Sequence, residues 1–361
     1  MKIVFDPFYK LNENVFSYNN CKNIIGGSWY YYFSKFAQEN NLPLVFAEKY
    51  LKNKCFSSDD VYLSEGVTSN TPRLLNTSAT PLIIYSGESP NIDWKFYSFI
   101  DKNTKPYKYA ILFSGAKKFI NKSTVFVPFL WPNDSNNIIH SENSLQNQLE
   151  KKKLVMIVSN KKQGFRHGGS RTRSYIKKNG IKILSRVISS MKLHDLYSVR
   201  MAALQYFSKT EDFQLYGKNW ENLIGLTNAE KNAVKILNPG EVVSKYKILP
   251  QYKFALCFEN CVYPGYITEK IFDCFFARCI PVYYGAPDVN EYVPKNTFID
   301  FRDFSSFDDL HSFLQHISIE DQLQYLNNID YFLKSDTFKR YTDKVFCDKI
   351  TKIILGHKLQ N

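Results

Sequence analysis

The stretch that most constrains the fold of this chain is residues 254–287, FALCFENCVYPGYITEKIFDCFFARCIPVYYGAP. It begins with the short apolar run FALCF, which is typical of a buried parallel strand, and residues 260–265 contain the Asn, Pro and Gly of a turn. Residues 268–279 are apolar almost all round and predict a buried helix, and IPVYY predicts a second buried strand. A helix that follows a parallel strand begins at the carboxyl edge of the sheet, where open α/β folds bind ligands.

Three charged residues interrupt this apolar unit near its loop: Glu259, Glu269 and Lys270. A carboxylate in the first turn of a helix suits the helix dipole, so Glu269 has a structural explanation as well as a functional one. A lysine in the first turn opposes the dipole. Lys270 is therefore either a solvated helix-end residue or the partner of a bound anion.

Strand and helix patterns alternate through the rest of the chain. NDSNN at 133–137 and the polar run to residue 153 predict a linker, with the domain boundary near 140–153. This alternation predicts an α/β fold with two doubly wound, Rossmann-like domains that face a cleft. We place the first domain at 1–150, the second at 151–335 and a basic amphipathic helix at 336–361. Strands are predicted at KIVFD, LVFA, VYL, LIIY, ILFSG, TVFVPFL, LVMIVSN, DFQLYG and FIDF, and helices at 29–40, 181–192, 197–209 and in SSFDDLHSFLQHI.

The net charge of +13 predicts an acidic partner: a nucleotide, a nucleic acid, an anionic membrane or an acidic saccharide. Most of this charge comes from residues 151–182, which contain eleven Lys or Arg and no Asp or Glu. Only Phe165 and Tyr175 interleave that block as stacking aromatics, and no nucleic-acid module motif accompanies it. We therefore predict no nucleic-acid partner, and a solvated loop is the alternative explanation of the block.

The cysteines and the apolar runs indicate a cytoplasmic protein. The seven cysteines include no CxxC pair, and four of them lie in apolar runs, as reduced core thiols do. The opening MKIVFDP is typical of a first strand rather than of a signal peptide, and no apolar run is long enough to span a membrane.

Two further residues are candidates because of their positions on predicted elements. Glu88 lies in the loop SGESP that leaves the strand LIIY, and site residues gather on such loops. Arg200 lies near the start of the predicted helix 197–209. A solvated carboxylate and a surface arginine are the ordinary alternatives.

Several kinds of site are missing from the sequence. It contains no GxGxxG, no Walker GxxxxGK[ST] and no GxSxG elbow. Its six histidines show no metal-binding spacing, and no cysteine pair is spaced for zinc. Because no DxD is present either, a bound diphosphate would have to be neutralised by cationic side chains and a helix N-terminus rather than by a metal.

Residues 254–287 resemble the signature of a known family. Residues 254–287 are similar to the signature of the α-1,3/4-fucosyltransferases of glycosyltransferase family ten, F-E-N-x…G-Y-[IV]-T-E-K-[IL]…[IV]-P-[IV]-Y-[WY]-G. The similarity is specific in that stretch and weaker through most of the second domain, and Tyr284 stands where Trp is common. In the first domain, YSGE at 85–88 resembles the family's Y-x-G-E loop.

The resemblance implies a GT-B fold that binds GDP-fucose in its C-terminal domain. It implies inverting transfer of L-fucose, α-1,3 in linkage, to an oligosaccharide acceptor that contains N-acetylglucosamine or glucose, in protein glycosylation or lipopolysaccharide biosynthesis. No cofactor is required, and a divalent cation is at most stimulatory. The resemblance assigns catalysis to Glu88, as general base, and to Glu269, and donor binding to Arg200, Asn260, Tyr266, Lys270, Tyr216 and Gly217.

Two assignments stay open at this stage. The chain has an insertion at 161–182 relative to the family, so Arg171 or Arg173 could hold the pyrophosphate in place of Arg200, whose position before DFQLYG matches the family's spacing. The helix at 336–361 is either a tail that docks peripherally at an anionic inner membrane or a core helix that returns to the first domain. Because no membrane anchor precedes the first strand, we expect a bacterial-type soluble member.

Two other functions compete with a fucosyltransferase. A GT-B transferase with a different nucleotide sugar would share the fold and the cationic site. A nucleic-acid or anionic-surface binding protein would use the basic block, but this hypothesis leaves the 254–287 unit unexplained.

Overall fold

A computed structural model of the chain describes all residues except 10, 12, 23, 140–144, 161–193 and 360–361. The described chain divides into two compact units. Unit 1 contains Met1–Ser135, Pro264–Glu269 and Asp336–Asn361, and unit 2 contains Asn136–Tyr263 and Lys270–Ser335. The units thus separate at Ser135 rather than at residue 150, and the C-terminal segment belongs to unit 1 instead of forming a separate part.

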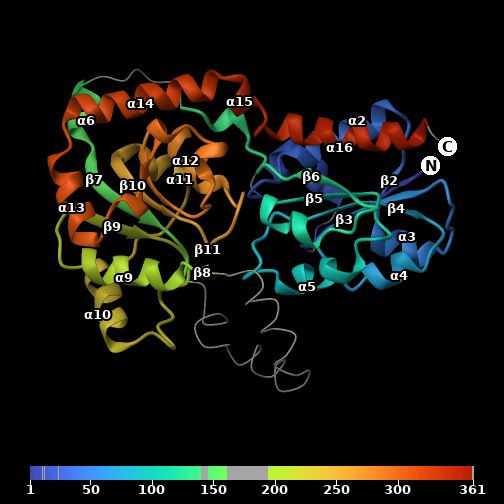
Figure 1. Cartoon of the computed structure of the whole chain (residues 1–361), viewed down its shortest axis with the longest axis horizontal. Coiled ribbons are helices and arrows are strands. Elements are labelled where there is room, and N and C mark those ends of the chain that lie inside the picture. Colours follow the sequence, from blue (N-terminus) through green and yellow to red (C-terminus); the bar gives the residue numbers. More distant parts are fainter. Residues whose placement is uncertain (10, 12, 23, 140–144, 161–193, 360–361) are drawn as a thin grey trace. The chain divides into compact units, whose positions relative to one another are not determined.

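Unit 1 is built on a parallel sheet that has six strands in the described chain (Figure 1). Every strand predicted for this half is present. The four inner strands are mostly buried, whereas the two edge strands have no buried position. The order across the sheet is β2-β1-β3-β4-β5-β6. The strands are β1 (Ile3–Asp6), β2 (Leu44–Phe46), β3 (Val61–Glu65), β4 (Thr80–Tyr85), β5 (Tyr109–Leu112) and β6 (Val125–Pro128).

Helices cover both faces of this sheet (Figure 1). One face carries α2 and α16, and the other carries α3, α4 and α5. Their bounds are α1 (Tyr18–Cys21), α2 (Trp29–Glu39), α3 (Ala47–Asn53), α4 (Thr71–Leu75), α5 (Trp94–Asn103), α15 (Asp336–Lys339) and α16 (Asp343–Lys358).

Unit 2 is also built on a parallel sheet, with the order β13-β12-β10-β7-β9 in the described chain. The strands predicted for this half are all present. They are β7 (Lys152–Ile157), β9 (Phe213–Tyr216), β10 (Tyr252–Phe258), β12 (Ile280–Tyr284) and β13 (Ile299–Asp300). A separate antiparallel pair, β8 (His194–Asp195) and β11 (Cys261–Val262), was not predicted.

The predicted helices of unit 2 are present where the structure describes them, and the one predicted at 181–192 lies outside the described residues. The helices α10 and α14 were not predicted, although each begins with a side-chain cap, Thr227 on α10 and Ser318 on α14. The bounds are α6 (Leu145–Glu150), α9 (Tyr197–Phe207), α10 (Asn228–Leu237), α11 (Lys245–Ile248), α12 (Glu269–Phe276), α13 (Phe307–His316) and α14 (Ile319–Lys334).

Both sheets reverse their strand order at one place. In unit 1 the chain adds β2 on one side of β1 and β3 on the other, and in unit 2 it adds β9 on one side of β7 and β10 on the other. Ligands of open α/β sheets bind where the strand order reverses, outside the carboxyl ends of the strands. The loops that follow β1 and β3, and those that follow β7 and β10, are therefore the places to look for sites.

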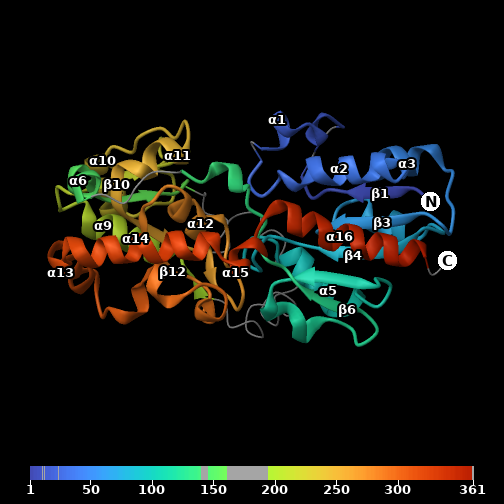
Figure 2. The same ribbon diagram turned by 90° about the horizontal axis from the view of Figure 1, so that it is seen from above.

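The C-terminal helix α16 is a core helix of unit 1. It lies beside α2 (Figure 2), and the rings of Trp29 and Phe346 are 5.2 Å apart and nearly perpendicular. Phe346, Ile350 and Ile354 are buried. Of the two alternatives left open for this segment, the structure therefore supports the helix that returns to the first domain, and the apolar face is not available to a bilayer.

No helix in the described ranges is both long enough and apolar enough to cross a membrane.

The packing of α16 predicts a large loss of stability on truncation of Phe346. Phe346→Ala should lower the free energy of unfolding by about 3–5 kcal/mol, because it leaves a cavity among the rings of Trp29, Tyr85 and Phe129. Urea unfolding followed by fluorescence measures this. Leu359→Ala, at an 88% exposed position just after the same helix, is the control and should change stability by less than about 0.5 kcal/mol. Equal effects of the two changes would contradict the assignment of α16 to the core.

Candidate functional site

The loop after β10 carries a fully buried carboxylate, Glu259, which forms an ion pair with Lys270. Glu259 is 0% exposed, and its Oε2 lies 3.0 Å from Nζ of Lys270 in the first turn of α12. The Lys270 side chain remains 27% exposed. A buried charge needs a partner of opposite charge, so the ion pair supplies a reason for a lysine at this helix start that sequence reasoning did not consider. The ammonium group has three N–H donors, so it can contact an anion as well.

Gly285, at the end of β12, makes room for this carboxylate. A Cβ atom at position 285 would lie 2.5 Å from Cγ of Glu259 and 2.5 Å from the hydroxyl of Tyr283. The amide of Glu259 also donates to the carbonyl of Tyr284 at 2.8 Å. The glycine of the YYGAP segment is therefore required by the close approach of β12 to Glu259.

Arg200 points into the interior of unit 2 rather than toward solvent. Its exposed fraction is 4%. Its Nη2 donates to the carbonyl of Phe258 at 2.6 Å and to Oδ1 of Asn260 at 3.1 Å. The amide of Leu196, just before α9, donates to the carbonyl of Asn260. Arg200 and Asn260, both predicted donor-binding residues, are thus brought together. The arginine holds the loop that carries Asn260.

Asn160 is a polar residue of this edge that sequence reasoning missed. It is 2% exposed and follows β7, so it lies at the reversal point of the sheet. Its side-chain amide donates to the carbonyls of Asn219 and Asn222, and its Oδ1 accepts from the hydroxyl of Tyr197. Asn160 thereby connects the ends of β7 and β9 with the start of α9. Its position at the end of the predicted strand LVMIVSN could have identified Asn160 as a candidate from the sequence.

Tyr216 and Gly217 lie at the end of β9, the neighbouring strand. The Tyr216 hydroxyl lies 3.1 Å from Oε1 of Gln214 and 3.3 Å from the hydroxyl of Tyr252. A Cβ atom at position 217 would overlap the carbonyl oxygen of Val158. Packing against β7 therefore accounts for Gly217, and its predicted role in donor binding stays a prediction.

Tyr266 and Glu269 belong to the short segment of unit 1 that interrupts the sequence of unit 2. Tyr266 is 1% exposed, and its ring packs edge to face on Phe113 with the centroids 5.0 Å apart. The structure thus gives Tyr266 a packing role, and donor contact by this side chain stays a prediction. Glu269 is partly exposed and is the first residue of α12.

Glu88 lies in unit 1, in the loop after β4. The Tyr9 hydroxyl donates to its Oε1 at 2.8 Å, and the Tyr97 hydroxyl donates to its backbone carbonyl at 3.0 Å. Its amide donates to Oγ of Ser86 at 3.2 Å. Glu88 is partly exposed, so the carboxylate is held in place and remains reachable.

Arg171 and Arg173 are not among the described residues. In the described part of the chain, no group of three or more His, Cys, Asp or Glu side chains is placed to hold a metal ion.

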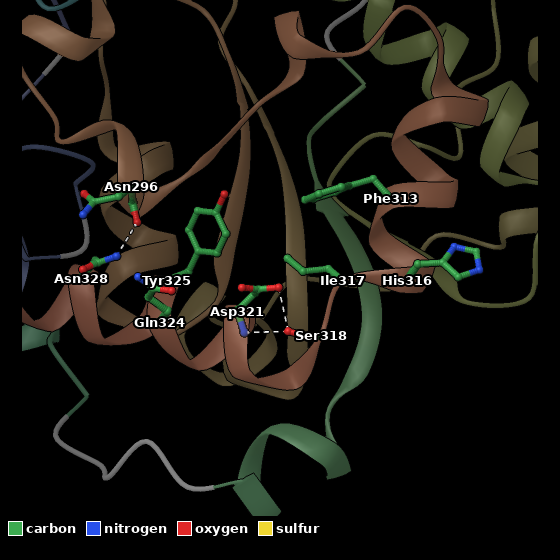
Figure 3. A pocket seen from close by; sticks show the side chains of 9 residues that line it. All are labelled: Asn296, Phe313, His316, Ile317, Ser318, Asp321, Gln324, Tyr325 and Asn328. Carbon is green, nitrogen blue, oxygen red and sulfur yellow. Dashed lines mark hydrogen bonds between the residues drawn. The ribbon is translucent and has the colours of Figure 1, made fainter.

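Unit 2 also contains a pocket of about 590 Å³ at the junction of α13 and α14 (Figure 3). Its hydrogen bonds belong to local structure: Ser318 and Asp321 cap α14, and Asn328 donates to the carbonyl of Asn296. None of the predicted site residues lines it. The lining residues are Asn296, Phe313, His316, Ile317, Ser318, Asp321, Gln324, Tyr325 and Asn328.

Comparison with known proteins decides the family. The family model "Glycosyltransferase family 10 (fucosyltransferase) C-term" matches residues 176–355, about half of the chain and most of unit 2. The chain belongs to glycosyltransferase family 10. The family suggested by the signature in 254–287 is thereby confirmed.

Among curated relatives of this family-10 chain is the alpha-(1,3)-fucosyltransferase FucT of Helicobacter pylori, 35% identical over a segment that covers 27% of this chain and 23% of that protein. GDP-fucose protein O-fucosyltransferase 3 of Homo sapiens is 37% identical over 25% of this chain and 19% of its own length. The similarity thus spans less than a quarter of these relatives.

Solved structures support the fold of this family-10 chain over nearly its whole length. A crystal structure of alpha1,3-fucosyltransferase matches 98% of this chain and 90% of its own, with a TM-score of 0.54 and 18% identity. The same comparison with a structure of alpha1,3-fucosyltransferase with GDP-fucose gives a TM-score of 0.51 and 17% identity. The fold is GT-B, as predicted.

The buried ion pair predicts an asymmetric response to mutation. Lys270→Ala should lower the free energy of unfolding by about 3 kcal/mol or more, because it leaves the Glu259 carboxylate buried without this partner. Adding Glu259→Gln should restore part of that loss, since the second change removes the charge. Lys235→Ala, on the exposed face of α10, serves as the control. Chemical denaturation measures all three variants, and additive losses in the double variant would contradict the pairing.

Proposed function

We propose that this family-10 chain transfers L-fucose from GDP-fucose to a hydroxyl group of an acceptor glycan, with inversion and with α-1,3 linkage. The acceptor is an oligosaccharide that contains N-acetylglucosamine or glucose. The observation that carries the proposal is the cluster of Glu259, Lys270, Arg200 and Asn260 at the carboxyl edge of unit 2, inside the half of the chain that matches the family.

The donor side of the proposal rests on charge. The leaving group, GDP, gains negative charge as the bond to fucose breaks. Lys270 presents an ammonium group in the first turn of α12, at the helix end whose dipole favours an anion. Arg200 holds the Asn260 loop beside it. Cations placed before the reaction stabilise the developing charge without reorganisation.

The acceptor side rests on Glu88. In our mechanism its carboxylate accepts the proton of the acceptor hydroxyl while that oxygen attacks the anomeric carbon. The bond from the anomeric carbon to the phosphate oxygen breaks, and its electron pair leaves with GDP. One displacement inverts the anomeric carbon, so no covalent intermediate forms. Tyr9 orients the carboxylate through its 2.8 Å hydrogen bond.

Glu269 has a separate role in this proposal. The sugar ring acquires oxocarbenium character in the transition state, and a nearby carboxylate stabilises that positive charge. Glu269 is the partly exposed carboxylate at the first position of α12, one residue before Lys270. The two residues would thus place opposite charges on the sugar side and the phosphate side of the donor.

The exposed face of the C-terminal helix is basic. Lys344, Lys352 and Lys358 are exposed on α16, whose apolar face is buried. We propose that any peripheral attachment to an anionic membrane uses these lysines electrostatically. A cytoplasmic location accompanies this proposal.

Glu88→Gln tests the general base. Transfer from GDP-fucose should fall by about 10²–10⁴-fold, because the amide cannot accept the proton. Binding of GDP, measured by calorimetry, should remain within about twofold of the wild-type value because the cations proposed to bind the diphosphate, Arg200 and Lys270, lie in unit 2. The matched control is Glu291→Gln, an exposed carboxylate change that should leave transfer unaltered. Full activity of Glu88→Gln would remove Glu88 from this role.

A donor site that neutralises the diphosphate with cationic side chains predicts resistance to chelators. Addition of EDTA to purified protein should leave at least half of the transfer activity, and re-addition of Mg²⁺ or Mn²⁺ should at most stimulate it.

Thermal-shift measurements with a panel of nucleotide sugars test the identity of the donor, because a ligand of the folded state raises the melting temperature. A larger shift with another nucleotide sugar than with GDP-fucose would favour a different donor.

A further inference from the structure

The pocket between α13 and α14 lies at the amino edge of the sheet of unit 2, and all of its lining residues belong to that unit. Nε2 of His311, in the middle of α13, is 3.4 Å from Oδ2 of Asp212, the residue just before β9. Asn296 lies just before β13, and Asn328 of α14 donates to its carbonyl at 3.1 Å. The proposed donor site follows the end of β10. The two places therefore lie at opposite edges of one parallel sheet.

Two aromatic side chains form sides of this pocket. Figure 3 shows Phe313 of α13 and Tyr325 of α14 at two sides of the space, with Ile317 and the Asp321 carboxylate between them. Phe313 is 36% exposed, and its ring packs on that of Phe304 with the centroids 5.3 Å apart. The ring of Phe313 is thus supported from within the protein and still accessible to a ligand.

Hydrogen bonds of the backbone and of capping groups shape the pocket before any ligand binds. The amide of Asp321 donates to Oγ of Ser318 at 3.0 Å, which fixes the start of α14. The amide of Ile317 donates to the carbonyl of Phe313 at 2.9 Å, which closes the last turn of α13. A site that is already formed loses little conformational entropy when it binds a ligand.

Polar side chains of the pocket have donors and acceptors to spare. In the described part of the chain, the side-chain amides of Asn296 and Gln324 make no hydrogen bond. Asn328 uses an N–H of its side-chain amide on the Asn296 carbonyl and keeps its amide oxygen as an acceptor. Asp321 accepts from the Ser318 hydroxyl through Oδ2, and a carboxylate can accept several hydrogen bonds. A ligand with many hydroxyl groups can satisfy all of these groups.

The charge of the pocket disfavours an anionic ligand. None of the described residues that line it is Lys or Arg, and Asp321 adds a negative charge. The ring of His316 points away from the space (Figure 3). In a chain whose net charge is +13, a pocket without Lys or Arg is unsuited to a phosphate, a nucleotide or an acidic saccharide.

We propose that the pocket between α13 and α14 is a binding site for a neutral oligosaccharide. The negative faces of the Phe313 and Tyr325 rings attract the polarised C–H groups on the apolar face of a sugar ring. The sugar hydroxyl groups, which both donate and accept, bind the amides and the carboxylate. A purely apolar ligand would leave those polar groups without hydrogen bonds. The volume of about 590 Å³ is ordinary for a site of this kind.

This inference goes beyond the proposed transfer reaction. The saccharide is bound at this pocket and is not chemically changed there. None of the residues to which we assign a part in transfer lines the pocket. The pocket therefore gives unit 2 a second ligand, at the edge of the sheet away from the proposed donor site.

Saturation-transfer NMR with the full chain tests the pocket, with lactose and cellobiose as neutral probes. The wild type should bind at least one of them. Tyr325→Ala should weaken that binding by about tenfold, because it removes one aromatic face together with its contact area. The matched control is Tyr331→Ala, at an 81% exposed position on the same helix and outside the pocket, which should leave the dissociation constant unchanged.

Gln324→Ala is a second variant that keeps the test valid if Tyr325→Ala folds poorly. Gln324 is exposed, so its truncation should change the free energy of unfolding by less than about 0.5 kcal/mol. Loss of one hydrogen bond to a sugar hydroxyl should weaken binding by about threefold or more. A thermal melt of each variant shows whether its fold is intact.

Three results would overturn the inference. The first is that neither saccharide binds the wild type. The second is equal affinity of the wild type, Tyr325→Ala and Gln324→Ala, because a saccharide held only at the acceptor site of unit 1 would give that result. The third is binding of an arginine-rich peptide, weakened by Tyr325→Ala, in place of either saccharide. No readout uses transfer, so a chain that binds saccharide here and transfers no fucose would overturn the proposed function alone.

Discussion

The carboxylate of Glu259 is the charge on which the proposed donor site depends. It is completely buried, and its ion pair with Lys270 joins the end of β10 to the first turn of α12. Burial of such a charge carries a large desolvation penalty. Removal of its partner therefore lowers the free energy of unfolding by more than the ion pair itself contributes to it. The pair therefore fixes the residue at which α12 begins. The same carboxylate requires glycine at position 285, because a larger residue there would collide with the Glu259 side chain.

The two sheets place opposite kinds of groups at corresponding points. At the reversal point of unit 2 lie Asn160 and the Glu259–Asn260 loop, with the cations Arg200 and Lys270 beside them. At the reversal point of unit 1 lies Tyr9, with Glu88 one strand away. Cations suit a departing diphosphate, and carboxylates suit a hydroxyl that must lose a proton. The same topology thus serves both halves of the proposed transfer.

The division of the chain into units does not follow its order. Pro264–Glu269 and the whole segment from Asp336 belong to unit 1, although unit 2 precedes and separates them. Tyr266 packs on Phe113, and Phe346 packs on Trp29. These aromatic contacts account for the burial of Tyr266 and Phe346 in unit 1.

The sequence by itself determined the strands, the fold class, the family and most of the candidate residues. Parallel strands of α/β folds are short apolar runs, and FALCF and IPVYY could be located from that pattern alone. The end of the run LIIY located Glu88, and the family resemblance located Asn260. The same signal was present at LVMIVSN, where it would have found Asn160.

Only the tertiary structure decided which groups meet. The partner of Lys270 is 11 positions away in sequence, and the partner of Glu88 is Tyr9, which follows β1. An amphipathic pattern in 336–361 fits either a membrane surface or a protein core, and the packing of Phe346 on Trp29 settles that the apolar face is internal. A periodic pattern of apolar residues indicates that one face of an element is buried. Which residues cover that face depends on contacts between residues far apart in the chain.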